Sequence, residues 1–90
     1  MILRRTKIEI IHDILKAIQN KGGKIKPTHL LYKSNLSHNK MKEYLNELIK
    51  KNMVEEKTDG KNKFYLITEN GVRYINEFKK IKEFSETFGL

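Results

Sequence analysis

Two amides and one ammonium group share a face of a helical pattern in residues 37–52. Asn39 and Asn46 lie two helical turns apart, and Lys42 flanks the face between them. An asparagine amide can pair with an adenine edge, and a lysine ammonium can bind a guanine edge or a phosphate. The opposite, apolar face comprises Met41, Tyr44, Leu45, Leu48 and Ile49. The segment therefore predicts an amphipathic helix whose outward face carries groups that bind nucleic acid.

The start of this helix offers a second kind of contact. Ser37 can cap the helix with its hydroxyl, and Leu36 before the cap can pack on Met41. The Ser37 hydroxyl and the first backbone N–H groups of the helix can then bind a phosphate. His38 can reach a base or a phosphate from the same end, although its angular position is nearer the apolar side. For each single residue, the alternative is a solvated helix position without a ligand.

The segments before this helix explain how it would be held. Residues 8–21 predict a helix that ends at Gly22-Gly23, and Ile25 then lies in a short extended link before Pro27. Residues 27–34 predict a short second helix that Asn35 ends. The apolar stripe of the first helix comprises Ile8, Ile11, Ile14, Leu15 and Ile18. Two helices joined by a tight turn, the second with a polar face, predict a helix-turn-helix.

A β-hairpin, or wing, is predicted after the helix-turn-helix, over residues 53–67. Its strands, residues 53–57 and 63–67, bracket Asp59-Gly60, a pair that tolerates the positive backbone angles of a hairpin tip. Its basic and amide side chains are Lys57, Lys61, Asn62 and Lys63, and a basic arm over residues 1–7 contributes Arg4, Arg5 and Lys7. Wing and arm can contact the DNA backbone, which supplies affinity rather than sequence preference. Because acidic residues interrupt the charge of the wing, a solvated hairpin tip is the alternative.

The last segment, residues 69–90, predicts a long helix that Thr68 caps and that Gly71 allows to approach the sheet closely. Its apolar stripe comprises Tyr74, Ile75, Phe78, Ile81, Phe84 and Phe88. A stripe this long exceeds what the preceding domain can cover. We therefore expect part of it to pack against a second copy of the chain in a homodimer, through Tyr74, Phe78, Ile81, Phe84 and Phe88. The alternative is a helix that folds back and buries the whole stripe in its own chain. Together the segments predict an α+β fold: a winged helix-turn-helix over residues 1–68 and a dimerisation helix over residues 69–90.

Composition restricts the possible functions. The net charge is +8, all of it in residues 1–68, which makes a polyanion the first partner to consider. The chain has no cysteine, and His12, His29 and His38 match no metal-ligand spacing, so we expect no metal and no cofactor. No Gly-rich phosphate loop or small-molecule substrate site is evident, and we expect no enzymatic activity. No apolar run approaches the roughly 20 residues of a membrane span, so we expect a cytoplasmic, nucleoid-associated protein without a membrane partner.

Three segments resemble the archaeal winged helix-turn-helix regulators, a family that includes the small dimeric, chromatin-associated DNA-binding proteins of Sulfolobus. They are KIEIIHDILKAI, NLSHNKMKEYLNELIKKNMVEE and FYLITENGVRYI, and the resemblance spans about residues 7–81. It implies binding of double-stranded DNA, sequence-preferring or architectural, and homodimerisation through the last helix as an antiparallel coiled coil. The last helix, about residues 69–88, is short for such a coil.

Two other function classes remain open from the sequence. Winged helices also serve as protein-interaction modules in which the recognition face is unused, and the positive charge on the arm and on residues 37–52 argues against this alternative. RNA binding is disfavoured because no aromatic pair lies on one exposed sheet face, since Phe64 and Tyr65 point to opposite sides of one strand. We therefore expect a homodimeric transcriptional regulator or small chromatin-type protein that binds double-stranded DNA.

Overall fold

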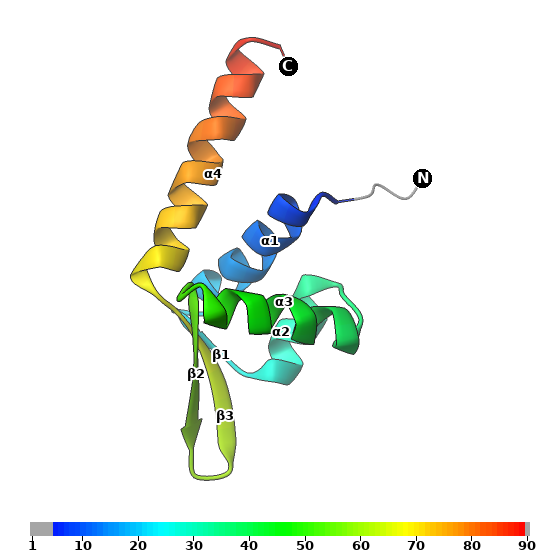
Figure 1. Ribbon diagram of the computed structural model, residues 1–90, viewed down its shortest axis with the longest axis vertical. Helices are drawn as coiled ribbons and strands as arrows, with labels where there is room; N and C mark the ends of the chain where they lie inside the picture. Colours follow the sequence, from blue (N-terminus) through cyan, green and yellow to red (C-terminus); the bar gives the residue numbers. More distant parts are fainter. Residues whose placement is uncertain (1–4, 90) are drawn as a thin grey trace.

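The structure, a computed structural model, describes residues 5–89, which form four helices and a small antiparallel sheet (Figure 1). The elements in chain order are α1 (Lys7–Asn20), β1 (Lys24–Ile25), α2 (Pro27–Ser34), α3 (His38–Lys50), β2 (Val54–Asp59), β3 (Asn62–Ile67) and α4 (Glu69–Thr87). Helices α1, α2 and α3 pack together, the β2–β3 hairpin projects from them, and α4 runs out to the opposite side (Figure 1). This is the α+β winged helix-turn-helix that the sequence predicts.

Polar side chains and glycine set the ends of α1. The hydroxyl of Thr6 accepts a hydrogen bond from the N–H of Glu9, and the Glu9 carboxylate accepts one from the N–H of Thr6 at 3.2 Å. The helix therefore begins at Lys7, one residue before the predicted start. It ends where Gly22 adopts a φ of 80° and the N–H of Gly23 donates to the carbonyl of Ile18 at 2.9 Å, as the glycine pair predicts.

Asparagines in the left-handed region end α2 and α3. Asn35 ends α2 with a φ of 55°, as predicted. The hydroxyl of Ser37 then caps α3 by accepting from the N–H of Lys40 at 3.2 Å, which is also as predicted. Helix α3 stops at Lys50 rather than at the predicted residue 52, because Asn52 has a φ of 58° and the N–H of Met53 returns to the carbonyl of Leu48 at 2.9 Å.

The sheet has the order β1-β3-β2. The predicted extended link is an edge strand, because Lys24 pairs with Leu66 and Ile25 pairs with Tyr65. The β2–β3 hairpin is paired up to Asp59 and Asn62, so its strands reach closer to the tip than predicted. The wing is therefore a regular two-stranded ribbon that is anchored at its base by a third strand.

One hydrophobic core joins the helices to the base of the sheet. Its buried members are Ile11, Ile14, Leu15, Ile18, Ile25, Leu30, Met41, Leu45, Leu48, Val54, Tyr65 and Ile75. Tyr65 is the core member of the Phe64–Tyr65 pair. Ile8 was expected in the core but is 55% exposed. Ile8 belongs to the first turn of α1, which is the outer end of the helix, away from the base of the sheet (Figure 1).

Gly71 is buried where α4 begins, and it brings this helix against the base of the wing. A Cβ at this position would lie 2.5 Å from the carbonyl oxygen of Met53 and 2.7 Å from Cγ1 of Ile67. Glycine thus permits the close approach that the sequence predicts. Within residues 5–89, no helix has a stretch long and apolar enough to cross a membrane.

Candidate nucleic-acid interface

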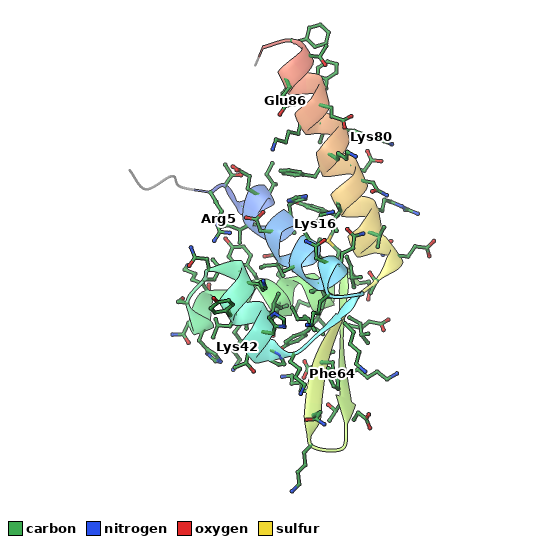
Figure 2. All side chains as sticks on the ribbon, turned by 180° about the vertical axis from the view of Figure 1, so that it is seen from behind. Arg5, Lys16, Lys42, Phe64, Lys80 and Glu86 are labelled. Atoms are coloured by element: carbon green, nitrogen blue, oxygen red, sulfur yellow. The ribbon has the colours of Figure 1, made fainter. Side chains whose placement is uncertain are left out.

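Helix α3 is anchored by one face and presents the other to solvent. Met41, Leu45 and Leu48 are buried in the core, while Ser37, His38, Asn39, Lys42 and Asn46 are all exposed. His38 is therefore on the open side, although its angular position suggested otherwise. Because the buried face fixes the helix, the exposed positions all project in a fixed direction from the domain. In Figure 2, Lys42 lies on the three-helix part of the domain, away from the outer end of α4.

The polar face of α3 is basic at its start. Lys42 has no carboxylate within ion-pairing distance among residues 5–89, whereas Lys40 lies 3.6 Å from Glu43. The hydroxyl of Ser37 accepts the hydrogen bond of the Lys40 N–H. The N–H groups before Lys40 have no acceptor inside the helix, because they belong to its first turn. These groups and the helix dipole favour an anion at this end. The exposed face of α3 therefore carries the amides of Asn39 and Asn46 and the ammonium of Lys42, and the start of the helix adds unpaired backbone donors.

The wing carries three lysines but no net charge. Lys57, Lys61 and Lys63 are matched by Glu55, Glu56 and Asp59 over residues 54–67. The ammonium of Lys63 lies 2.9 Å from Glu56, and the hydrogen bond that it donates to this carboxylate raises the pKa of Lys63. Lys63 is therefore charged but held against its own hairpin, while Lys57 and Lys61 have no ion pair within residues 5–89. The wing offers local contacts to a phosphate rather than a broad positive surface.

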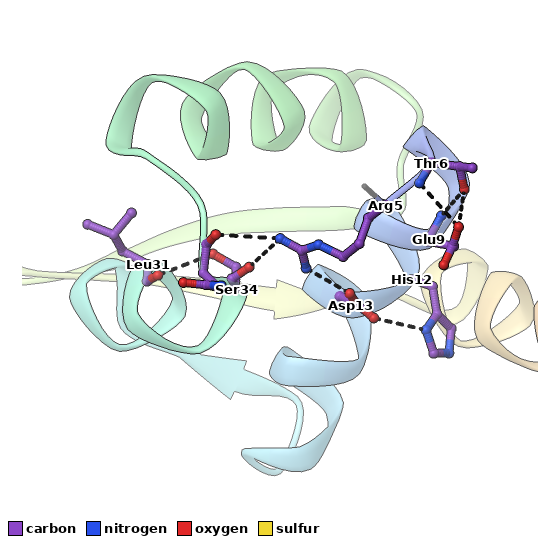
Figure 3. A network of polar contacts seen from close by, with 8 residues as sticks. Arg5, Thr6, Glu9, His12, Asp13, Leu31 and Ser34 are labelled. Carbon is purple, nitrogen blue, oxygen red and sulfur yellow. Dashed lines mark hydrogen bonds and ion pairs between the residues drawn. The ribbon is translucent and has the colours of Figure 1, made fainter. Parts of the chain in front are cut away.

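The N-terminal arm differs most from expectation. Arg4 lies outside the described residues. Arg5 does not lie in a free arm, because its guanidinium donates to Asp13 at 2.8 Å and to the carbonyl of Ser34 at 3.0 Å (Figure 3). Lys7 bonds to Glu47 of α3 at 2.9 Å, a contact that raises the pKa of Lys7 and lowers that of Glu47. Both side chains tie α1 to neighbouring elements.

A basic tract that we did not predict runs through α1, β1 and α2 into α3. Residues 14–42 contain seven lysines and no aspartate or glutamate. Lys24, Lys26 and Lys33 belong to this tract and are exposed. Lys24 also places its ammonium 4.1 Å from the centre of the Phe64 ring. Counting acidic residues along the chain, rather than lysines alone, is the signal that would have located this tract.

The apolar stripe of α4 is divided between the domain and solvent. The hydroxyl of Tyr74 donates to the carbonyl of Ile8 at 2.9 Å, and Phe78 stacks on His12 with ring centres 4.2 Å apart. These two residues, expected at a dimer contact, thus pack on α1 of their own chain. The other three, Ile81, Phe84 and Phe88, are 62–65% exposed, so α4 does not fold back to bury its whole stripe.

Three comparisons place this geometry among known proteins. A family model described as winged helix-turn-helix matches residues 4–86. An uncharacterized protein of Methanocaldococcus jannaschii, MJ0290, is 32% identical over 88% of this chain, which spans 35% of that relative's length.

Two solved structures have the same fold. Sso10a-2, a DNA-binding protein from Sulfolobus solfataricus, superposes with a TM-score of 0.80 at 26% identity, covering 93% of this chain and 85% of that one. F93 from STIV, a winged-helix DNA-binding protein, has a TM-score of 0.71 at 17% identity and covers 89% of this chain and 92% of its own.

Proposed function

This chain belongs to the winged helix-turn-helix family, and on that premise we propose that it binds double-stranded DNA as a homodimer. The observation that carries the proposal is the outward face of α3, where Asn39, Lys42 and Asn46 are exposed on a helix fixed by its buried face. An α-helix fits the major groove of B-DNA, where these side chains can reach base edges. We assign the protein to transcription regulation or to small chromatin-type proteins of the nucleoid.

Each part of the domain has a proposed role. Asn39 pairs with a base edge, Asn46 extends this contact by two turns, and Lys42 binds a base or a phosphate. Ser37 and His38 contact the backbone at the end where helix N–H groups are free. From the wing, Lys61 and Lys63 approach the backbone, with Lys63 exchanging Glu56 for a phosphate. Arg5 is not proposed to contact DNA, because its guanidinium already donates hydrogen bonds to Asp13 and to the carbonyl of Ser34.

The homodimer is proposed to form through the outer part of α4. Ile81, Phe84 and Phe88 are large apolar side chains exposed in a single chain, and the ring centres of Phe84 and Phe88 lie 4.8 Å apart. Residues 69–90 carry four basic and four acidic side chains, so two such helices can pair without net repulsion. Covering these side chains with those of a second copy removes their apolar surface from water.

Binding of a fluorescent duplex by the full chain, measured by anisotropy over a salt series, tests the DNA proposal. Lys42→Ala should weaken binding and reduce the slope of log affinity against log salt by about one if the ammonium contacts a phosphate. Asn39→Ala should cost about 1–3 kcal/mol on a preferred site. Lys79→Ala is the matched control, because Lys79 is exposed on α4, away from α3. Equal effects of Lys42→Ala and Lys79→Ala would refute the role of α3, and absence of binding would favour a protein-interaction module.

Sedimentation velocity tests the dimer separately. Phe84→Glu should shift a dimer to a monomer, because a charge buried at the contact has no partner there. Lys79→Glu changes charge on the same helix but away from the apolar stripe, so it should leave the dimer intact. A wild-type protein that is monomeric at micromolar concentration, or a dimeric Phe84→Glu variant, would refute this part of the proposal.

A further inference from the structure

A groove of about 460 Å³ lies between α1 and α2, and its lining within residues 5–89 includes none of the side chains of α3. Residues on one face of α1, at positions 13, 16, 17 and 20, form one wall, and His29 and Lys33 of α2 form the other. Ile25 of β1 lines the groove as well. Its volume lies within the usual range for small-molecule sites and exceeds that of the hollow beside the start of α4, about 300 Å³.

The groove is strongly cationic. Arg5, Lys16, Lys21 and Lys33 line it together with one carboxylate, Asp13, a formal net charge of +3. Within residues 5–89, no carboxylate lies within ion-pairing distance of the three lysines. Their charges are therefore uncompensated by the protein, while their aliphatic stems and Ala17 supply apolar surface to the same space. An anion with an apolar body matches both properties.

Arg5 connects the groove to the turn before α3 (Figure 3). One guanidinium nitrogen donates to Asp13 of α1 at 2.8 Å, and the other donates to the carbonyls of Ser34 at 3.0 Å and Asn35 at 3.5 Å. These carbonyls lie at the end of α2, where backbone acceptors lack partners within the helix. The guanidinium thus holds α1 against the turn that leads through Ser37 into α3.

We propose that this groove binds a small organic carboxylate, and that its occupancy is coupled to the α2–α3 turn through Arg5. A ligand carboxylate matches the fork of the guanidinium, of which Asp13 engages one nitrogen in the structure. It would be held by Lys16 and Lys33 from opposite walls and would compete with Asp13 and Ser34 for Arg5. Because the turn precedes the recognition helix, the ligand would change the affinity for DNA, a consequence that depends on the function proposed above.

Titration of the ¹⁵N-labelled full chain with sodium benzoate, followed by amide chemical shifts at constant ionic strength, tests the site without DNA. Benzoate has the charge and a ring, benzamide has the ring without the charge, and inorganic phosphate has charge without the ring. We expect saturable benzoate binding with a Kd on the order of 1 mM or tighter for a ligand of this size. Benzamide and phosphate should bind about tenfold more weakly or not at all, because each lacks one of the two contacts.

Two double variants with the same loss of charge provide the control. Lys16→Ala/Lys33→Ala should weaken benzoate binding about tenfold or more, while Lys79→Ala/Lys82→Ala on α4 should change it less than twofold. Ser34 and Asn35 line the groove themselves, so the coupling is read from residues 36–38, whose amide signals should shift together with those of the groove. Absence of saturation, equal binding of benzamide or phosphate, or equal losses in both double variants would overturn the site. Groove shifts without any shift in residues 36–38 would overturn the coupling.

Because this titration contains no DNA, failure of the groove and failure of DNA binding are distinguishable. If the chain binds benzoate as described but binds no duplex, the carboxylate site stands and its effect on DNA binding is refuted. If the chain binds duplex with an affinity that saturating benzoate leaves unaltered, the effect on DNA binding is refuted as well, whatever the amide shifts show.

Discussion

Replacing Gly71 with alanine should loosen the attachment of α4 to the rest of the domain. The added Cβ would lie 2.5 Å from the carbonyl oxygen of Met53 and 2.7 Å from Cγ1 of Ile67. The carbonyl of Met53 is not free to move, because it accepts a hydrogen bond from the N–H of Thr68 at 3.1 Å. Thr68 in turn caps α4 through its hydroxyl, so a shift of this carbonyl would disturb the start of the helix.

Two opposing effects set the size of the change. Alanine favours a helical conformation over glycine by up to about 1 kcal/mol. Overpacking of a well-packed site costs about 1–3 kcal/mol, and the upper part of this range applies because one clashing atom belongs to the backbone. We therefore expect the free energy of unfolding to fall by about 1–2 kcal/mol. For a domain of this length, that change lowers Tm by roughly 5–15 °C.

Urea unfolding followed by far-UV circular dichroism measures this loss. All variants are compared at one protein concentration, because the stability of a dimer depends on concentration. Asn76→Ala is the matched control, since Asn76 is exposed on the same helix and its replacement should leave stability unchanged or raise it slightly. A Gly71→Ala protein as stable as the wild type would show that α4 is not held at the observed distance from the wing.

Two further changes probe the turn and the base of α4. Asn35 has a φ of 55°, so Asn35→Gly should retain stability while Asn35→Ala should lose about 1 kcal/mol in urea unfolding; equal stability of the two variants would contradict this. Burial raises the pKa of Tyr74, so the folded state favours the neutral phenol. The contribution of this phenol to the free energy of unfolding is therefore complete below the pKa of the unfolded state, near 10, and is lost as the pH rises through the pKa of the folded state. Tyr74→Phe, which loses the hydrogen bond to Ile8, should be less stable than wild type by about 1 kcal/mol at pH 8, and the difference should narrow above about pH 10; a constant difference would argue against the bond.

Local sequence rules predicted most of the fold. The glycine pair after α1, the cap at Ser37, the left-handed Asn35 and the Asp59-Gly60 tip each depend on residues within a few positions of one another. The errors at helix ends were local as well. The Thr6–Glu9 capping box has a recognisable spacing in the sequence, and it would have given the start of α1.

The candidate interface was only partly open to prediction. The exposed face of α3 follows from a helical period and was predicted as a set, and the contacts of these residues with DNA remain a proposal. The contacts of the basic arm could not be predicted in this way, because the hydrogen-bond partners of Arg5 lie in α1 and at the end of α2, up to 30 residues away. No local rule indicates which carbonyls a guanidinium reaches once helices have packed.

By itself, the sequence specified the four helices and the hairpin, where the chain turns, and that the charge excess lies before residue 69, because these properties depend on neighbouring residues and on composition. Only the tertiary structure decided that Tyr74 and Phe78 pack on α1 while Ile81, Phe84 and Phe88 stay exposed. It also decided that lysines from α1 and α2 line one groove together with Arg5. The reason is physical: the period of a helix defines a face, but the angle at which two helices pack determines how much of that face is covered and which side chains meet.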